Sequence, residues 1–263
     1  MKKLLTCLFC GLLAIQVCAY ENTYAIIIGV ADYKNYGADD GDLKYTTKDA
    51  KLFYDFLKSK KGGSVPAQNI VFLTDAKATK ANIISQGKNL FAKANRNDRV
   101  ILYFSGHGSK GCFVPYDAGS TGDKYLYFSE VKAIFRNAKC KTKLLFADAC
   151  FSGSMKKNET KAVQELLTKE VKATSDMNIA VMMSCKGTET SIEMPDLHQG
   201  LFTYYLIKGL GGLANTDNNQ YVTIKELFYY VYKKTQAKAA SIGHTQTPEL
   251  FGKFDLRLIV AKI

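Results

Sequence analysis

The sequence contains no tryptophan, only 4 prolines and only 3 histidines among its 263 residues. The low proline count, alongside 20 glycines, excludes collagen-like and low-complexity chains. Beyond residue 19, no apolar run reaches the roughly 18 residues of a membrane-spanning helix. None of the cysteines beyond that point forms a Cys-x-x-Cys pair, which argues against a structural zinc site. The composition is ordinary and globular, and the length suits one large domain or two small ones.

Basic residues outnumber acidic residues, because 36 Lys and Arg stand against 24 Asp and Glu, for a net charge of +12. Such an excess is typical of proteins that bind nucleic acids or anionic surfaces. However, the lysines are scattered along the chain, and no zinc-finger or RNA-binding signature is present. We therefore expect a solvated basic surface and no nucleic-acid partner.

The first 19 residues have the pattern of a secretory signal peptide. Lys2 and Lys3 precede an apolar stretch over residues 4–15, and small side chains follow at Val17 and Ala19. We expect cleavage after Ala19 and export of the mature chain to the periplasm or the medium. After removal of this segment, the sequence predicts no membrane association.

Apolar strands alternate with amphipathic helices through the rest of the chain. Residues 24–30 form a continuous apolar run, typical of a strand buried on both faces, and residues 46–57 carry a helical apolar stripe. By the same criteria we expect strands over 70–74, 100–105, 143–147, 180–184 and 254–260, and helices over 79–94, 129–137, 201–210 and 224–234. This order predicts an α/β fold with a mostly parallel six-stranded sheet and helices on both faces.

Two of the predicted strands end in reactive residues. Residues 100–105 are followed by His107 between two glycines, and residues 143–147 are followed by Asp148-Ala149-Cys150. In an open parallel sheet, ligands bind beyond the carboxyl ends of the strands. An imidazole beside a thiol lowers the thiol pKa and transfers its proton. A core cysteine and a loop histidine are the commoner roles of each residue alone, but their joint position predicts a Cys150–His107 catalytic dyad. The backbone amides of Gly108 and Cys150 are the candidate oxyanion donors.

These two segments, SGHG and DACFSG, resemble the His-Gly and Ala-Cys boxes of the caspase-like cysteine peptidases. The similarity is greatest to the metacaspases and their bacterial relatives, the orthocaspases. Residues 24–33, Lys48-Asp49-Ala50 and Thr190-Ser191 extend it over nearly all of the mature chain. The resemblance implies a caspase-like three-layer sandwich with a large-subunit-like half over residues 20–154 and a small-subunit-like half over residues 177–263.

The resemblance also implies which peptide bond is cut. Asp148 lies two residues before Cys150, so both face the same side of an extended strand. Caspases share a glutamine at the position of Asp148. In metacaspases an acidic S1 pocket forms instead, and the resemblance assigns it here to Asp49, Ser105 and Asp148. Such a pocket would bind Arg or Lys at P1 of a protein or peptide substrate. Two other interpretations remain open, because Thr46-x-x-Asp49 is a helix-capping pattern and Asp148 could merely orient a loop.

The chain departs from the metacaspase pattern in three places. Tyr45-Thr46 stands where Gly-Cys is usual, and Phe151 stands where His is usual. Eukaryotic members carry an acidic calcium-binding insert after the histidine, but here residues 109–124 contain only Asp117 and Asp123 as acids. Calcium dependence by that route is not expected.

Residues 215–226 resemble a calcium-binding EF-hand loop. Gln220 occupies the position that needs glycine for the sharp turn. We therefore favour a polar turn followed by a helix that Thr223 and Glu226 cap. The sequence indicates no metal and no cofactor.

Residues 155–176 are rich in Lys, Glu and Thr and lie where caspase relatives are cut into two subunits. We expect a mobile linker there, with a surface helix over residues 162–171 as the alternative. An enzyme that cleaves after basic residues could process itself at Lys156, Lys157 or Lys161.

Two alternative functions stay open beside a secreted cysteine endopeptidase. A cysteine-dependent α/β-hydrolase acting on small esters needs its histidine after the nucleophile, here His198 or His244. Asp148 and Ser152 stand where the nucleophile turn of that fold needs glycines. The other alternative is a non-catalytic caspase-like domain that acts as a binding scaffold.

Overall fold

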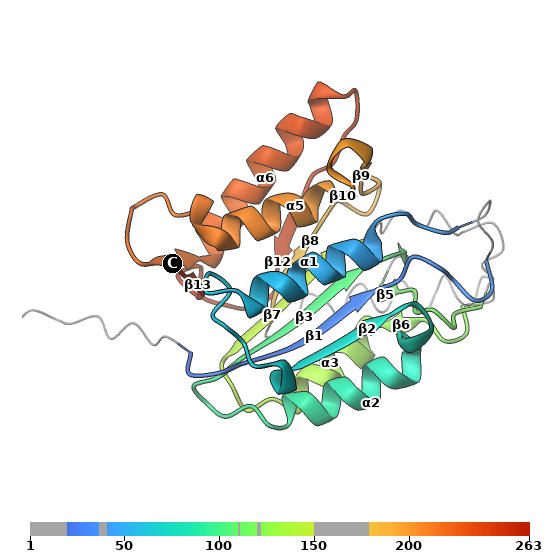
Figure 1. The fold of residues 1–263 in the computed structure, drawn as a ribbon, viewed down its shortest axis with the longest axis horizontal. Helices are drawn as coiled ribbons and strands as arrows, with labels where there is room; N and C mark the ends of the chain where they lie inside the picture. The colour runs from blue at the N-terminus through green and yellow to red at the C-terminus, as the bar shows by residue number, and fades with distance from the viewer. Residues whose placement is uncertain (1–19, 37–40, 110, 120–121, 150–178) are drawn as a thin grey trace, which may run out of the picture.

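A computed structural model describes residues 20–36, 41–109, 111–119, 122–149 and 179–263. Its centre is a six-stranded sheet in the order β12-β8-β7-β3-β1-β2 (Figure 1). The strands are β1 (Thr23–Gly29), β2 (Ile70–Thr74), β3 (Arg99–Ser105), β7 (Thr142–Asp148), β8 (Ala180–Met183) and β12 (Glu249–Phe251). All neighbouring pairs are parallel except β12 with β8, which is antiparallel. The predicted mostly parallel six-stranded sheet is therefore confirmed.

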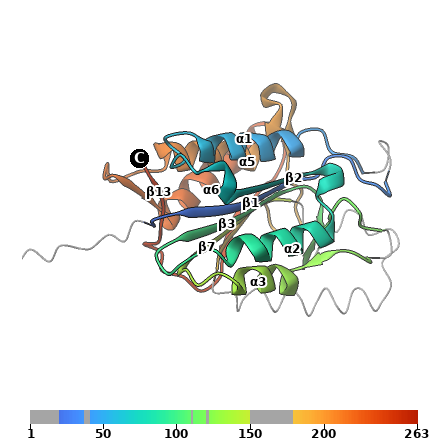
Figure 2. The ribbon, with the colours of Figure 1, turned by 60° about the horizontal axis from the view of Figure 1, so that its bottom comes forward.

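Helices cover both faces of this sheet and give the three-layer arrangement expected from the sequence. Figures 1 and 2 show one face under α1 (Thr46–Lys58), α5 (Leu201–Lys208) and α6 (Ile224–Ser241), and the other under α2 (Lys80–Phe91) and α3 (Phe128–Arg136). Alternate side chains of each strand supply two cores. Ile26 and Ile28 of β1 pack into the core beneath α2 and α3, whereas Ala25 and Ile27 pack into the core beneath α1, α5 and α6.

The apolar runs that predicted buried strands are buried on both faces. Every residue of β3 is buried, and on the α1 side Phe53 stacks on Tyr103 with ring centroids 4.4 Å apart. A strand covered on both faces needs apolar side chains at consecutive positions, which explains why these strands lack polar alternation. The sheet thereby becomes a rigid support for the residues that follow its strands.

The prediction of the last strand over residues 254–260 is wrong. The sixth strand of the sheet is β12, which pairs with β8 through Leu250 and Met182. Residues Ile259–Lys262 form β13, which pairs with β11 (Tyr221–Thr223) in a separate two-stranded sheet. A three-residue strand is too short to show a period, so the sequence offered no pattern at 249–251. Helix α6 also extends seven residues beyond its predicted end at 234, to Ser241.

Short strands frame the loops beyond the sheet. Strands β4 (Gly108–Ser109), β5 (Cys112–Phe113) and β6 (Leu126–Tyr127) form a three-stranded antiparallel sheet directly after β3. Strands β9 (Glu193–Met194) and β10 (Gln199–Gly200) form a hairpin that leads into α5. These two units carry the residues that surround the carboxyl ends of the main strands.

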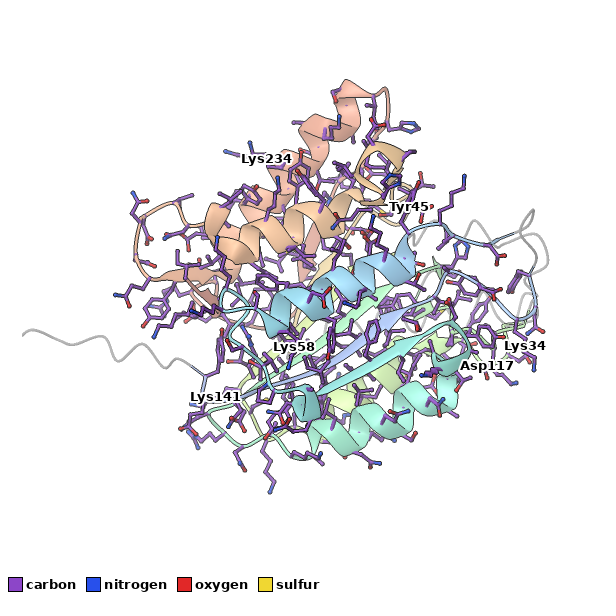
Figure 3. The ribbon with its side chains drawn as sticks, viewed as in Figure 1. Lys34, Tyr45, Lys58, Asp117, Lys141 and Lys234 are labelled. Carbon is purple, nitrogen blue, oxygen red and sulfur yellow. The ribbon has the colours of Figure 1, made fainter. Side chains whose placement is uncertain are left out.

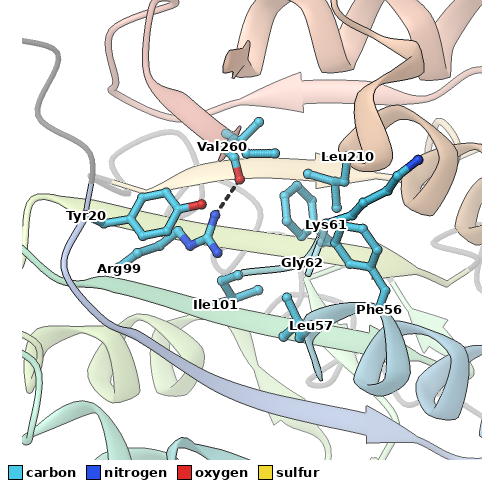
Figure 4. Close-up of a pocket in the computed structure, with 11 residues that line it drawn as sticks. Tyr20, Phe56, Leu57, Lys61, Gly62, Arg99, Ile101, Leu210 and Val260 are labelled. Carbon is cyan, nitrogen blue, oxygen red and sulfur yellow. Dashed lines mark hydrogen bonds between the residues drawn. The ribbon is translucent and has the colours of Figure 1, made fainter. Parts of the chain in front are cut away.

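The amino end of β3 holds a buried arginine. Arg99 is 2% exposed, its Nε and Nη2 donate to Thr23 Oγ1 at 3.2 and 3.0 Å, and its Nη1 donates to the carbonyl of Val260. The Tyr20 ring lies 3.6 Å from the guanidinium carbon, and the group lines a small cavity (Figure 4). These contacts tie β1, β3 and β13 together at the end of the sheet opposite the residues discussed below.

The basic side chains are distributed around the molecule. Figure 3 shows Lys34 at the right, Lys141 at the lower left and Lys234 towards the top, with Lys58 near the centre of the view. This distribution agrees with the solvated basic surface expected from the sequence. Within the described part of the chain, none of the helices is sufficiently long and apolar to cross a membrane.

Candidate active site

The carboxyl ends of the adjacent strands β3 and β7 open into a small cavity. Gly29 of β1, Ser105 of β3 and Asp148 of β7 stand in one row of the sheet. The cavity has a volume of about 70 Å³, and four predicted site residues line it: Asp49, Ser105, His107 and Asp148. Gly108 follows His107 directly at the start of β4. Cys150 and the processing candidates Lys156, Lys157 and Lys161 lie outside the described residues, which resume at residue 179.

His107 is held by two hydrogen bonds of different kinds. Its backbone N–H donates to the hydroxyl of Tyr33 at 2.6 Å, and its ring Nε2 lies 2.5 Å from the carbonyl oxygen of Gly41. A carbonyl can only accept, so Nε2 carries the proton and Nδ1 keeps a free lone pair. Burial lowers the pKa of the imidazole, against the raising effects of the Gly41 hydrogen bond and of Glu193 and Asp42. In this tautomer Nδ1 is the ring nitrogen that can accept a proton.

The backbone around His107 explains the glycines on either side. A Cβ at Gly106 would lie 2.9 Å from the Tyr33 hydroxyl and 3.1 Å from the Phe104 ring, so the close approach of Tyr33 requires glycine there. The carbonyl of His107 accepts from the N–H of Val114, the residue after β5, at 3.0 Å. In a trans peptide the next N–H points the opposite way. The N–H of Gly108 is thus directed away from β5, as an oxyanion donor requires.

Asp49 does not cap its own helix, so the capping interpretation of Thr46-x-x-Asp49 is wrong. The Thr46 hydroxyl instead donates to the carbonyl of Val30 at 2.6 Å. The Asp49 carboxylate accepts from the N–H of Gly200 at 3.0 and 3.1 Å and from Ser105 Oγ at 3.3 Å. The helix thus presents the carboxylate to the cavity, and Ser105 orients it there.

Asp148 is bound on both of its oxygens. Ser191 Oγ donates to Oδ1 at 2.5 Å, while the N–H and hydroxyl of Thr203 donate to Oδ2 at 3.1 and 2.7 Å. A Cβ placed on Gly200 would lie 2.4 Å from Asp148 Oδ2 and 2.7 Å from Asp49 Oδ2, so both carboxylates face the same point. Burial raises the pKa of each carboxyl, and the charge of Asp148 raises that of Asp49 further. Two acids at this spacing form a cavity that favours a cation.

Glu193 is a third acid at the cavity and was not predicted. Its carboxylate accepts from the backbone N–H groups of Lys44 and Tyr45 at 2.8–3.2 Å, at the start of α1. Its charge contributes to raising the pKa of Asp49, Asp148 and His107. Sequence reasoning also missed Tyr33, Gly41 and Gly200. The family match over residues 24–33 included Tyr33, and the Thr190-Ser191 match lies just before Glu193, but neither match assigned a role to these residues.

A sequence model of the caspase domain matches residues 22–256 of the chain. The chain belongs to the caspase-domain family of peptidases. The family is the one that the two boxes resemble, and the cavity of this caspase domain lies where both boxes leave the sheet.

A curated bacterial protein and a solved structure are among the proteins similar to this caspase domain. A probable protease of a Desulfuromonadales bacterium is 25% identical over 258 residues, which are 86% of this chain and 31% of that protein. The chain therefore spans about a third of the length of this curated relative. The crystal structure of the protein GSU0716 from Geobacter sulfurreducens has a TM-score of 0.60 at 17% identity, covering 90% of this chain and 97% of that one. This similarity supports the fold alone.

The structure bears on two alternative interpretations, the α/β-hydrolase and the EF-hand loop. His198 and His244, the histidines that an α/β-hydrolase would need, do not line the cavity, whereas His107 does. In the EF-hand-like segment, Glu226 accepts from Thr223 and Thr216, as expected for a capped helix after a polar turn. Across the described residues, no group of three or more His, Cys, Asp or Glu side chains could hold a metal ion.

Proposed function

We propose that the protein is a cysteine endopeptidase that cleaves peptide bonds after Arg or Lys. The observation that carries this proposal is the pair of buried carboxylates, Asp49 and Asp148, in the cavity that His107 also lines. Cys150 follows Asp148 by two residues, so the acidic cavity adjoins the sequence position of the nucleophile.

The chemistry uses Cys150 and His107 as a dyad. Nδ1 of His107 takes the thiol proton, and the thiolate attacks the carbonyl carbon of the substrate. The N–H groups of Gly108 and Cys150 stabilise the oxyanion, and the imidazolium then protonates the leaving amine. In the second half of the reaction, His107 takes a proton from water, the water oxygen attacks the thioester, and the carboxylic acid product leaves as the Cys150 thiol is regenerated. The hydrogen bond between Nε2 and the carbonyl of Gly41 favours the tautomer with the proton on Nε2, which leaves Nδ1 able to accept the thiol proton.

The S1 pocket of the proposed enzyme consists of Asp49, Ser105 and Asp148, with Glu193 at its edge. The raised pKa values of the two aspartates mean that the empty pocket retains protons more readily than free carboxyls do. A guanidinium or ammonium group at P1 lowers those pKa values and replaces the protons. An acidic P1 side chain would add a further negative charge to a buried acidic cavity, which is strongly unfavourable.

Fluorogenic peptides with Arg, Lys, Leu or Asp at P1 test the proposal under reducing conditions. Wild type should cleave the Arg and Lys peptides only, and Cys150→Ala and His107→Ala should lose turnover by at least about a hundredfold. Asp148→Asn should lose the preference for basic residues. Asp55→Asn is the matched control, because Asp55 is exposed on α1 and pairs with Lys51. Cleavage after Asp would reject the pocket assignment, and a folded wild type that cleaves nothing would leave the non-catalytic binding domain.

Export and self-processing belong to the same proposal. A signal peptide over residues 1–19 would place the mature amino terminus at Tyr20, and a basic preference would allow cuts after Lys156, Lys157 or Lys161. Mass spectrometry of protein purified from the producing cells tests both. An intact amino terminus would reject signal removal, and the same fragments in wild type and Cys150→Ala would reject self-processing.

A further inference from the structure

Gln246 is a buried glutamine to which the sequence assigned no role. It follows α6 and is 1% exposed. Its side chain makes three hydrogen bonds, and each of them reaches a segment at the cavity. The amide is oriented by its neighbours, because the N–H of Ile192 can only donate to Oε1, at 3.0 Å.

The first connection runs to the carboxylate of Asp148. Gln246 Nε2 donates to Ser191 Oγ at 3.2 Å, and Ser191 Oγ donates to Asp148 Oδ1 at 2.5 Å. The single hydroxyl proton of Ser191 is used towards the carboxylate, so its oxygen is left to accept from Gln246. Gln246 therefore fixes the direction in which Ser191 points and, through it, the orientation of Asp148.

The second connection runs to the end of the strand that carries the nucleophile. Gln246 Nε2 donates to the carbonyl of Ser184 at 3.0 Å. The Ser184 hydroxyl accepts from the N–H of Ala149 and donates to its carbonyl, both at 3.1 Å. Ala149 immediately precedes Cys150 in the sequence. The same amide group is thus linked to the S1 carboxylate and to the residue before the nucleophile.

Gln246 is itself anchored. The adjacent Thr247 donates to Glu189 through its N–H at 2.6 Å and its hydroxyl at 3.0 Å. This pair holds the segment after α6 against the loop that leads to Ser191, so Gln246 has little freedom to adopt another conformation.

We propose that Gln246 is a positioning residue that couples the S1 carboxylate Asp148 to the strand end before Cys150. The inference rests on the proposed peptidase function. Loss of the amide removes the hydrogen bond that Ser191 accepts from Gln246, and it takes away a partner of the Ser184 carbonyl and of the Ile192 N–H. Binding of a basic P1 group and placement of the nucleophile should then deteriorate together.

Gln246→Leu and Gln246→Glu are the informative variants. Leucine removes all three hydrogen bonds, whereas glutamate keeps an acceptor for Ile192 and loses both donors. Thr235→Val is the matched control, since Thr235 is fully buried in α6 and its hydroxyl has no hydrogen-bond partner in the described structure. Thermal melting shows which variants are folded, and Gln246→Glu keeps the test available if the leucine variant does not fold.

Two measurements test the proposal on folded variants. In kinetics with an Arg peptide, Gln246→Leu and Gln246→Glu should each lower kcat/KM by about tenfold or more, with a higher KM, while Thr235→Val stays within about twofold. Adding Ser191→Ala to Gln246→Leu should cause little further rise in KM, because both act on Asp148 through the same link. A twofold or smaller effect of both Gln246 variants, or fully additive effects on KM, would overturn it.

Calorimetry with benzamidine, an amidinium that mimics the arginine side chain, separates the two proposals. Weaker binding by about tenfold in the Gln246 variants, but not in Thr235→Val, supports the coupling even if wild type shows no turnover. Equal binding by wild type and the Gln246 variants overturns the coupling and leaves the peptidase proposal intact. A wild type that neither binds benzamidine nor cleaves any peptide overturns both.

Discussion

The hydroxyl of Tyr33 accepts the backbone N–H of His107 at 2.6 Å, and the two rings lie side by side with centroids 5.0 Å apart. Tyr33 is 1% exposed, and burial raises the pKa of its phenol. The phenol therefore stays neutral and fixes both the backbone and the ring face of the histidine. This contact links the loop after β1 to the residue that follows β3.

Tyr33→Phe tests this contact directly. The substitution keeps the ring but leaves a buried N–H without an acceptor, so we expect a loss of about 1–3 kcal/mol in stability. The rate constant kcat should fall as well, because the imidazole loses part of its positioning. Melting curves and peptide kinetics check both. Tyr229→Phe, at an exposed position of α6, should change neither, and a fully active and stable Tyr33→Phe would contradict the assignment.

Asp49→Asn should stabilise the empty protein in a pH-dependent way. Because burial and the charge of Asp148 raise the pKa of Asp49, the native state binds this proton more tightly than the unfolded chain does. Stability is then lost as the pH rises above the ordinary carboxyl pKa of about 4. Asparagine is neutral throughout, so the stability of Asp49→Asn relative to wild type should rise steadily from pH 4 to pH 8.

Thermal melting between pH 4 and pH 8 measures this difference. Asp55→Asn is the control on the same helix, where an exposed pair with Lys51 is expected to contribute no more than about 0.5 kcal/mol. The Asp55 variant should be slightly less stable at neutral pH. A constant difference between Asp49→Asn and wild type across the range would show that the charge of Asp49 is not penalised by burial.

Gly200→Ala should close the pocket. The added methyl group would lie 2.4 Å from Asp148 Oδ2 and 2.7 Å from Asp49 Oδ2, so it must displace both carboxylates. We expect KM for Arg peptides to rise by at least about tenfold. Gly187→Ala is the control, since nothing lies within 4 Å of a Cβ at that position. The measurement is KM for an Arg peptide in both variants. Equal KM values would show that the P1 side chain does not bind between Asp49 and Asp148.

Glu226→Gln should weaken the start of α6 whether or not calcium is present. Burial alone would raise the pKa of Glu226, but hydrogen bonds from Thr223 and Thr216 lower it. The carboxylate is therefore stabilising above the ordinary pKa of about 4.3, and this contribution is lost as the pH falls through the lowered value. At pH 7 we expect a loss of about 0.5–1.5 kcal/mol, because the glutamine amide keeps only one of the two oxygens that accept these hydrogen bonds.

Melting of wild type and Glu226→Gln with and without calcium provides the measurement. The difference between the two proteins should be the same in both conditions and should shrink in acid. Stabilisation of wild type alone by sub-millimolar calcium would instead favour the EF-hand interpretation of residues 215–226.

The sheet was predictable because its strands are unusually uniform. Residues 24–30 and 100–105 are apolar at nearly every position, a pattern that only a strand covered on both faces requires. The final strand was placed wrongly because the three residues of β12 carry no period, and because the apolar residues of β13 serve a different sheet. The prediction of the sixth strand failed because β12 is too short to show a pattern.

The sequence by itself determined which residues leave the sheet at one edge. His107, Asp148 and Cys150 follow apolar runs, and parallel strands bring their carboxyl ends together whatever the loops do. The family boxes follow from that same local pattern. Thus the sequence predicts His107 and Asp148 as site residues, and the structure places both at one cavity.

Only the tertiary structure decided what surrounds them. Asp49 could equally have capped its helix, and it is the N–H of Gly200, 151 positions away, that draws it into the cavity instead. Glu193 reaches the site from the two-residue strand β9 and Gln246 from the segment after α6, both too short to show a period, and each does so through hydrogen bonds to backbone or hydroxyl groups. Periodicity reports burial against a face, whereas a polar contact between two loops depends on where the packed helices and strands bring them. That information is absent from any local stretch of the chain.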